Sequence, residues 1–426
     1  MKLHFLRFIF LCVSLGFNSH LSAQVTIGGG GQPNKGALLD LKQHDAVTAG
    51  GVTATKGLGL PRVKLIKQKG DLASTIDGAF MFSYTDDHTG LVIYNINECI
   101  GGSGRDNGVY VWTGSEWIPL QNKDEEELAP GVIQVTDNRD QELGPQTYLA
   151  REFSYTENNV KVDVGIWMLE NLRYIPLSTD NSFIHSPDEA EIEKHWCYPL
   201  AGGGLYNPSK AKQEWLPNLG ILYNWAAAMN GYEPSCSDQG EYDQNDGADG
   251  VQQGICPDGW HVPSDHEWND LEQAIYHNPT EYSTYTTGYT FNPASWKDEW
   301  NGSLDLPSPA QGPRGSDSGE GHGYAMLAKC RVSSLPNFIT TKGKSLSPRK
   351  GGFSFEFAGR GRNGAVESLG DVGDVWSGSI HSLNRAGENS NAWCRSIYTG
   401  YPTNNAKVVR HNYGVYHLFS VRCKKD

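Results

Sequence analysis

The sequence contains the stretch Gly254-Ile-Cys-Pro-Asp-Gly-Trp-His-Val-Pro-Ser-Asp-His-Glu-Trp268, which predicts the start of a helix. Ser264 can cap the first turn with its hydroxyl, and Glu267, three residues later, can return a bond to the backbone of Ser264. After this capping box, apolar residues recur at helical spacing, so we expect one face of the helix to pack in a core. That face consists of Trp268, Leu271 and Ile275.

A second helix is expected upstream of this stretch. Residues 218–229 carry strong helix formers after Tyr223, and Asn230-Gly231 can end a helix as a C-terminal cap. Most of the remaining chain is interrupted by glycine, serine and asparagine, with few helical stretches. Helices are therefore expected to be a minority in a loop-rich domain.

Composition limits the class of protein. Glycine accounts for 50 of 426 residues, well above the ordinary share of about 7 %. Charged residues make up 20 % and hydrophobic residues 38 % of the chain, which suits a folded, turn-rich protein with two or three domains. The formal net charge of −14 argues against nucleic acid as a partner, since phosphate binding needs clustered lysine and arginine.

The N-terminus resembles an export signal. Lys2 and Arg7 precede an apolar run over residues 8–17, and the small-residue exit Leu21-Ser-Ala23 follows. We therefore expect a signal peptide over residues 1–23, cleaved after Ala23. The run is too short for a membrane span, which needs about 20 residues. The expected location is the cell surface or the medium, with the periplasm as an alternative.

The cysteines indicate structural disulfides. Without Cys12 of the signal peptide, seven of the eight cysteines remain, and none forms a Cys-x-x-Cys pair. Zinc and thioredoxin-like redox motifs are therefore not indicated, whereas an oxidising compartment favours disulfides. The pairing is left open by the sequence, and among the alternatives we favour Cys256 with Cys423.

Two regions and a linker are expected in the mature chain. Residues 24–121 contain short apolar runs broken by glycine, proline and asparagine, which are typical of strands, and a hairpin is expected across Thr113-Gly114-Ser115. Residues 122–131 are acidic and end in Pro-Gly, as a linker does. Residues 132–426 form the second region.

Three kinds of catalytic motif receive no support. Residues 359–364 have the letters of a dinucleotide fingerprint, but the flanking segments cannot supply a crossover helix, so we interpret them as a turn. No His-Glu-x-x-His motif indicates a metal-dependent hydrolase, and no Gly-x-Ser-x-Gly motif indicates a serine nucleophile. A glycan-acting hydrolase stays as an alternative without a motif, and we expect no catalytic residues.

Two groups of residues are candidates for binding. An acidic loop offers oxygen ligands of the kind that calcium prefers, although its spacing does not fit an EF-hand and a solvated acidic loop is the alternative. Aromatic residues in a loop-rich region offer a surface for a sugar or a protein, with core packing as the alternative. The calcium candidates are Asp243, Asn245, Asp246 and Asp249, and the ligand-binding candidates are Trp296, Trp300, Tyr282 and Tyr285.

Several motifs in order resemble one family, the Fibrobacter succinogenes major paralogous domain. They lie at residues 166–172, 220–229, 254–268, 352–359, 375–377 and 419–426. The resemblance spans about 160–426 and implies a module of exported and surface proteins. That family is similar to C-type-lectin-like folds, which implies an α+β domain with long loops.

The N-terminal region resembles a surface-protein or tail-fibre connector. The resemblance rests on residues 36–41, 57–62, 90–95 and 108–114. It implies a stalk and a homotrimer. The expected fold class is therefore α+β, with a β-rich N-terminal connector domain followed by a C-type-lectin-like α+β domain.

The expected function is that of an exported binding or adhesion protein, which recognises a glycan or surface-protein ligand without catalysis and needs no cofactor apart from the calcium considered above. The alternatives are the glycan-acting hydrolase and a structural subunit of a surface assembly.

Overall fold

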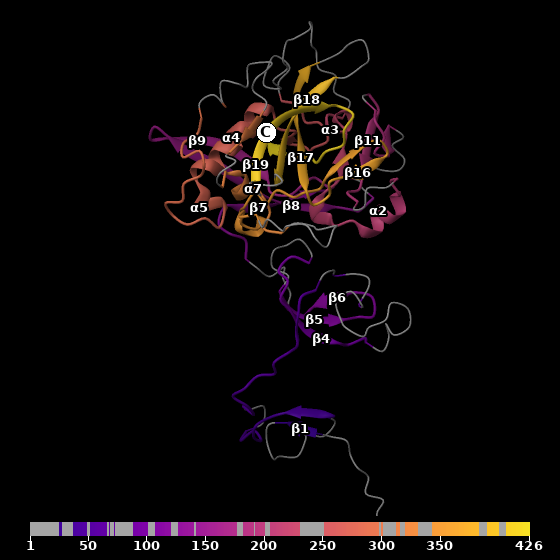
Figure 1. The fold of residues 1–426 in the computed structure, drawn as a ribbon, viewed down its shortest axis with the longest axis vertical. Helices are drawn as coiled ribbons and strands as arrows, with labels where there is room; N and C mark the ends of the chain where they lie inside the picture. Colours follow the sequence, from indigo (N-terminus) through magenta and orange to yellow (C-terminus); the bar gives the residue numbers. More distant parts are fainter. Residues whose placement is uncertain are drawn as a thin grey trace, which may run out of the picture. The chain divides into compact units, whose positions relative to one another are not determined.

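The computed structural model describes the chain in segments: residues 25–27, 37–48, 52–65, 68, 72, 88–100, 107–120, 127–139, 142–176, 182–190, 192–200, 205–230, 251–297, 300, 312–315, 320–330, 343–382, 390–399 and 406–426. They fall into two compact units, one ending at Pro61 and one beginning at Arg62 (Figure 1). The expected signal peptide lies outside the described residues, as do residues 122–126 of the expected linker at 122–131.

Among its described residues, the first unit contains one pair of strands. β1 (Val25–Ile27) and β2 (Leu39–Leu41) pair in parallel, with Val25 opposite Leu39. Leu39 and Leu41 are both exposed, so this short pair does not bury its own leucines within the unit.

The second unit begins with a small four-stranded sheet in the order β3-β4-β5-β6. β5 and β6 form the expected hairpin, in which Trp112 lies opposite Trp117 and the turn places Gly114 at a φ of 99°. One face of the sheet carries a small core of Leu65, Leu72, Ile93, Tyr110, Trp112 and Trp117. The strands are β3 (Arg62–Val63), β4 (Val92–Asn95), β5 (Gly108–Trp112) and β6 (Trp117–Pro119).

Two larger sheets form the frame of the following region. A five-stranded sheet has the order β13-β20-β9-β8-β7, and a four-stranded antiparallel sheet has the order β14-β19-β18-β17 (Figure 1). The first consists of β7 (Val132–Asp137), β8 (Gln146–Glu157), β9 (Val160–Met168), β13 (Trp260–His261) and β20 (Lys424–Lys425). The second consists of β14 (Gly312–Arg314), β17 (Val372–Ser382), β18 (Asn391–Thr399) and β19 (Ala406–Gly414).

Smaller strand pairs complete the β-structure. The expected turn at residues 359–364 is confirmed as part of a hairpin, in which Asn363 and Gly364 both have positive φ, as a tight two-residue connection requires. The two strands of this hairpin are β15 (Arg360–Arg362) and β16 (Ala365–Glu367). A separate three-stranded sheet consists of β10 (Phe183–His185), β11 (Lys194–Cys197) and β12 (Leu222–Tyr223).

The expected helix after Ser264 is confirmed. The Ser264 hydroxyl accepts a bond from the Glu267 backbone N–H, and the Glu267 carboxylate accepts one from the Ser264 backbone N–H, which completes the capping box. The other described helices are one or two turns long. The helical segments are α2 (Pro208–Glu214), η2 (Pro217–Leu219), α3 (Trp225–Ala228), α4 (Asp265–His277), α5 (Pro279–Tyr282), α7 (Gly323–Met326) and η4 (Pro348–Lys350).

The expected α+β class is wrong, because the described chain is mainly β. The stretch at 218–229, expected to be a helix, instead forms the strand β12 and the single turn α3. In β12, Leu222 pairs with Cys197, and Tyr223 pairs with Trp196 and exchanges backbone bonds with Phe419. Strand pairing therefore holds Leu222 and Tyr223 outside the helix, whereas the helix formers after Tyr223 do form one, the single turn α3.

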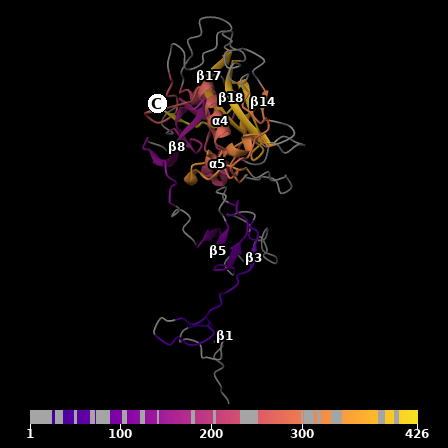
Figure 2. The ribbon, with the colours of Figure 1, turned by 90° about the vertical axis from the view of Figure 1, so that its left-hand side faces the viewer.

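Helix α4 lies between the two larger sheets. It contacts β8 and β9 of one sheet and β17 and β18 of the other (Figure 2). Its expected core face is confirmed, since Trp268, Leu271 and Ile275 are fully buried. The Trp268 ring lies 5.0 Å from that of Trp167 in β9, measured between ring centroids.

The motifs that carry the family resemblance meet in this core. Arg422 donates from Nε to the Asn171 side chain at 2.8 Å and from Nη2 to the Ser354 carbonyl at 2.8 Å. Its guanidinium also lies 4.3 Å from the centroid of the Phe353 ring. Three motifs far apart in sequence are thus joined by one buried arginine.

Removing the capping hydroxyl should weaken the fold. We expect Ser264→Ala to lower the free energy of unfolding by about 1 kcal/mol, because one helix-terminal N–H loses its acceptor. Urea unfolding followed by tryptophan fluorescence measures this. The control is Thr287→Ala, at an exposed loop position, which should change the unfolding midpoint little; equal effects of the two substitutions would show that the cap contributes nothing.

Candidate functional site

Charged side chains from α4 and three strands meet in the interior of the domain. Asp265 and Glu272 are seven residues apart on α4, about two turns, so they share one face. Arg395 of β18 joins them: its Nε lies 2.6 Å from Oε1 of Glu272, and its Nη1 bonds to Asp265. Arg410 of β19 and Arg314 of β14 complete what we call the charge cluster.

All five side chains of the charge cluster are at least 98 % buried. Arg410 Nε lies 2.7 Å from Asp265 Oδ2, and Arg314 Nη1 lies 2.9 Å from Glu272 Oε1. Arg395 and Arg410 stand directly opposite each other on neighbouring strands. That like-charged pair is tolerable because the α4 carboxylates lie against both guanidinium groups.

The carboxylates stay ionised despite their burial. Burial by itself would raise the pKa of Asp265, but Arg395 and Arg410 outweigh it and lower the pKa to about 2. The pKa of Glu272 is likewise lowered, because Arg314 and Arg395 outweigh its burial. Both carboxylates are therefore charged at neutral pH and fully engaged in ion pairs.

The charge cluster carries one positive charge in excess, since three arginines face two carboxylates. Arg410 stacks on the Trp393 ring, with its guanidinium carbon 3.4 Å from the ring centroid, which favours a desolvated cation. His322 Nε2 lies 3.1 Å from Glu272 Oε2. No described group bonds to Nδ1 of His322, although this atom is buried.

Two of the predicted ligand-binding residues lie beside His322. Trp296 and Trp300 are half-buried, and their rings meet edge-on with centroids 4.8 Å apart. The His322 ring centroid is 5.7 Å from Trp296 and 6.1 Å from Trp300. The Trp300 carbonyl accepts a bond from Arg314 at 3.3 Å. We call these two residues the tryptophan pair. Arg314 of the charge cluster contacts Trp300, and His322 lies near both rings.

The two predicted tyrosines pack instead. Tyr282 is fully buried, with its ring centroid 4.7 Å from that of Phe153. Tyr285 is 9 % exposed, stacks on Tyr289 at 4.0 Å and donates its hydroxyl to Glu320 at 2.8 Å. Neither ring offers a free face to a ligand, so the tryptophan pair is the better candidate.

The predicted calcium residues Asp243, Asn245, Asp246 and Asp249 lie outside the described residues. Within the described part of the chain, no group of three or more histidine, cysteine, aspartate or glutamate side chains is arranged to hold a metal ion.

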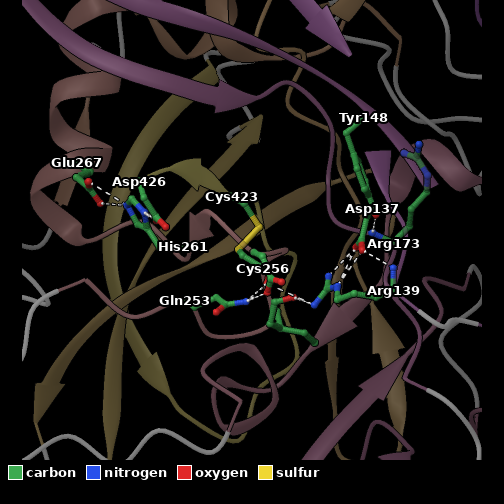
Figure 3. Close-up of a disulfide and its surroundings, with 12 residues drawn as sticks. Asp137, Arg139, Tyr148, Arg173, Gln253, Cys256, His261, Glu267, Cys423 and Asp426 are labelled. Carbon is green, nitrogen blue, oxygen red and sulfur yellow. Dashed lines mark hydrogen bonds and ion pairs between the residues drawn. A yellow bond between two sulfur atoms is a disulfide. The ribbon is translucent and has the colours of Figure 1, made fainter. Parts of the chain in front are cut away.

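Cys256 and Cys423, the pair favoured from the sequence, form a disulfide (Figure 3). The bridge ties the segment before α4 to the C-terminal strand. Nearby, His261 lies between two carboxylates, 3.1 Å from Glu267 and 2.8 Å from Asp426. These interactions hold the chain that enters α4.

A second disulfide joins Cys99 to Cys330, 231 residues away. Beside it, Lys329 forms an ion pair with Glu98 at 2.9 Å. Nothing in the spacing of the cysteines indicates this pairing, because its partners lie in separate regions of the sequence. Cys197 and Cys394 are free and buried, and burial raises the pKa of both thiols.

Exposed apolar side chains gather in the N-terminal part of the chain. Of the eighteen large hydrophobic residues that are exposed among the described residues, thirteen lie between positions 27 and 133. They are Ile27, Leu38, Leu39, Leu41, Val47, Val52, Leu58, Val92, Tyr94, Ile96, Ile118, Leu120 and Ile133. Seven of them, up to Leu58, lie in the first unit, and the other six lie in the second.

Two regions of the chain, one N-terminal and one C-terminal, each match the model of a known family. The fold and the disulfides define a β-rich, disulfide-bonded protein built of two kinds of module. The model of the Fibrobacter succinogenes major domain matches residues 160–425, and the chain belongs to that family. The model of a phage tail like trimerisation region matches residues 26–135. Comparisons with curated proteins and with solved structures found no match.

The two matches indicate a surface or structural protein, and the second indicates a homo-oligomer. The family resemblance inferred from the motifs is thereby confirmed. None of the described helices is long and apolar enough to span a membrane.

Sequence reasoning missed the charge cluster. Arg314, Arg395 and Arg410 lie on three strands, and no local pattern marks them as partners of α4. One signal was available: Asp265 and Glu272 occupy the same helix face as the core residue Trp268. Carboxylates on an apolar face require buried partners.

Breaking the charge cluster should be costly. We expect Arg395→Met to lower the free energy of unfolding by about 3 kcal/mol or more, because two buried carboxylates each lose a cation. Lys161→Met is the control, since Lys161 and Glu152 form an exposed ion pair whose loss should cost less than about 1 kcal/mol. Urea unfolding of both variants measures the difference, and a small effect of Arg395→Met would contradict the structural role of the charge cluster.

Proposed function

We propose that this chain is an exported surface protein that forms a homotrimer through residues 26–135 and presents its C-terminal domain for ligand recognition. The observation that carries the proposal is the coincidence of two findings in one segment. The trimerisation model matches residues 26–135, and most of the exposed large apolar side chains of the described chain fall in the same range. Burial of such side chains between copies would drive association.

Export is supported by the sequence and the disulfides. The pattern at residues 1–23 remains a prediction, and the proposed location is the cell surface or the medium. Two disulfides fit an oxidising compartment, since cytosolic proteins seldom keep them.

The proposed ligand site is the tryptophan pair, and the proposed ligand is a glycan or a surface protein. Trp296 and Trp300 are half-buried and rest on His322, so their rings are held in place before a ligand arrives. Preorganised aromatic rings bind sugars and protein side chains at low entropic cost.

The charge cluster does not favour the hydrolase alternative. A glycosidase needs a carboxylic acid and a carboxylate that reach the substrate. Asp265 and Glu272 are fully buried and paired with arginines, so they suit a structural role. The proposed C-terminal activity is therefore binding without turnover.

The assembly can be tested by sedimentation equilibrium of the protein that begins at Gln24. We expect a mass three times that of one chain, because the exposed apolar side chains within residues 26–135 would be buried between three copies. A single-chain mass across the micromolar range would contradict the proposed trimer, and a two-chain mass would replace it with a dimer.

Ligand binding can be tested on glycan and mucin arrays, with calcium or with a chelator, while release of cleaved product is followed. Trp296→Ala and Trp300→Ala should each weaken binding about tenfold or more, as loss of an aromatic anchor does. Trp215→Ala, at another half-buried tryptophan, is the control and should leave binding unchanged.

Product release in this assay would instead support the hydrolase. Loss of binding in chelator would support the calcium site proposed at Asp243, Asn245, Asp246 and Asp249. If the tryptophan variants bind as well as the unaltered protein, the ligand site lies elsewhere.

A further inference from the structure

We infer that one face of the β3–β6 sheet is the surface on which a second copy of this chain docks. This face, which we call the outer apolar face, consists of Val92, Tyr94, Val109, Val111 and Ile118. The inference rests on the proposed homotrimer and names the surface that would hold it together.

The alternation of burial along the strands separates the two faces. In β4, Ile93 is buried, whereas Val92 and Tyr94 are 36 % and 37 % exposed. In β5, Tyr110 and Trp112 are buried in the small core, whereas Val111 points to the opposite face and is half-buried. Successive residues of a strand point to opposite faces, so the exposed set lies together.

The pairing register brings the outer residues into one patch. Val92 lies opposite Val111, and Tyr94 lies opposite Val109. Val111 also lies opposite Ile118 of β6, which is 43 % exposed. Direct cross-strand neighbours have Cβ atoms about 5 Å apart, so these side chains form a continuous apolar surface.

A sheet that packs on its inner face alone would not need apolar residues on its outer face. An antiparallel sheet that packs only one face normally carries polar residues on the other. Here the outer positions of β4, β5 and the first part of β6 are valine, tyrosine and isoleucine, and the neighbouring polar group is Arg62, opposite Tyr94 at the edge. Both faces of the sheet are therefore suited to burial.

The occupant that fits is another copy of the same sheet. The outer apolar face lies wholly within residues 26–135, the segment that matches the trimerisation model. Among the described residues, the inner core has six buried apolar side chains, and so small a sheet is marginal by itself. Packing the outer faces of three copies together would add a second core on the other side of the sheet and bury the exposed valines and isoleucine.

The test compares the association of substituted full-length mature proteins. Val111→Lys should raise the dissociation constant of the trimer about a hundredfold or more, because an unpaired ammonium would be buried between copies. Val160→Lys is the matched control: Val160 is 64 % exposed at the start of β9, outside the proposed surface. Sedimentation equilibrium over a dilution series gives the constants, and circular dichroism reports whether each variant is folded.

Val111→Thr serves where Val111→Lys fails to fold, since threonine keeps the branched shape and the strand preference. It should raise the dissociation constant about tenfold. If the unaltered protein is trimeric and both Val111 variants associate as tightly as it does, the outer apolar face is not the interface, while the trimer stands. If the unaltered protein is a single chain at every concentration, the proposed trimer itself fails.

Discussion

The ion pairs between α4 and the arginines of β14, β18 and β19 determine how the C-terminal domain is put together. Asp265 and Glu272 are fully buried, and a buried carboxylate without a cation would be severely destabilising. The helix can therefore lie only where the arginines of the four-stranded sheet reach it. Its opposite contacts, through Trp268 to Trp167, attach it to the five-stranded sheet. The charge cluster thus fixes the helix between the two sheets. Its Arg314 also donates a hydrogen bond to the carbonyl of the half-buried Trp300.

Local chemistry made several elements predictable. The capping box at Ser264, the hairpin around Gly114 and the turn at Asn363-Gly364 each depend on residues within a few positions of one another. The helix expected over residues 218–229 is limited to Trp225–Ala228, because helix propensity is a local quantity, whereas β12 before it is held by Cys197 and Phe419 from other parts of the chain. The α+β expectation came from the likeness to C-type-lectin-like folds, and it failed because the described helices other than α4 are only one or two turns long.

The candidate binding residues could likewise be predicted only in part. All four candidates were chosen from the sequence because they are aromatic: Trp296, Trp300, Tyr282 and Tyr285. Only the tertiary structure shows that the two tryptophans are half-buried and the two tyrosines are buried. The partners Cys99 and Cys330, and the arginines of the charge cluster, come together only through the tertiary fold. The outer apolar face was more accessible to sequence reasoning, since β5 has no charged side chain at any position from Gly108 to Trp112.

We propose, as the central claim, that the N-terminal region joins three copies of the chain. The C-terminal domains then stay separate from one another and bind the ligand. Single-particle electron cryomicroscopy of the intact mature protein tests it most directly. The account predicts a threefold particle whose β3–β6 sheets meet at the axis through Val92, Val111 and Ile118, with three separate C-terminal domains. Single chains, or copies joined through residues 132–426, would contradict it.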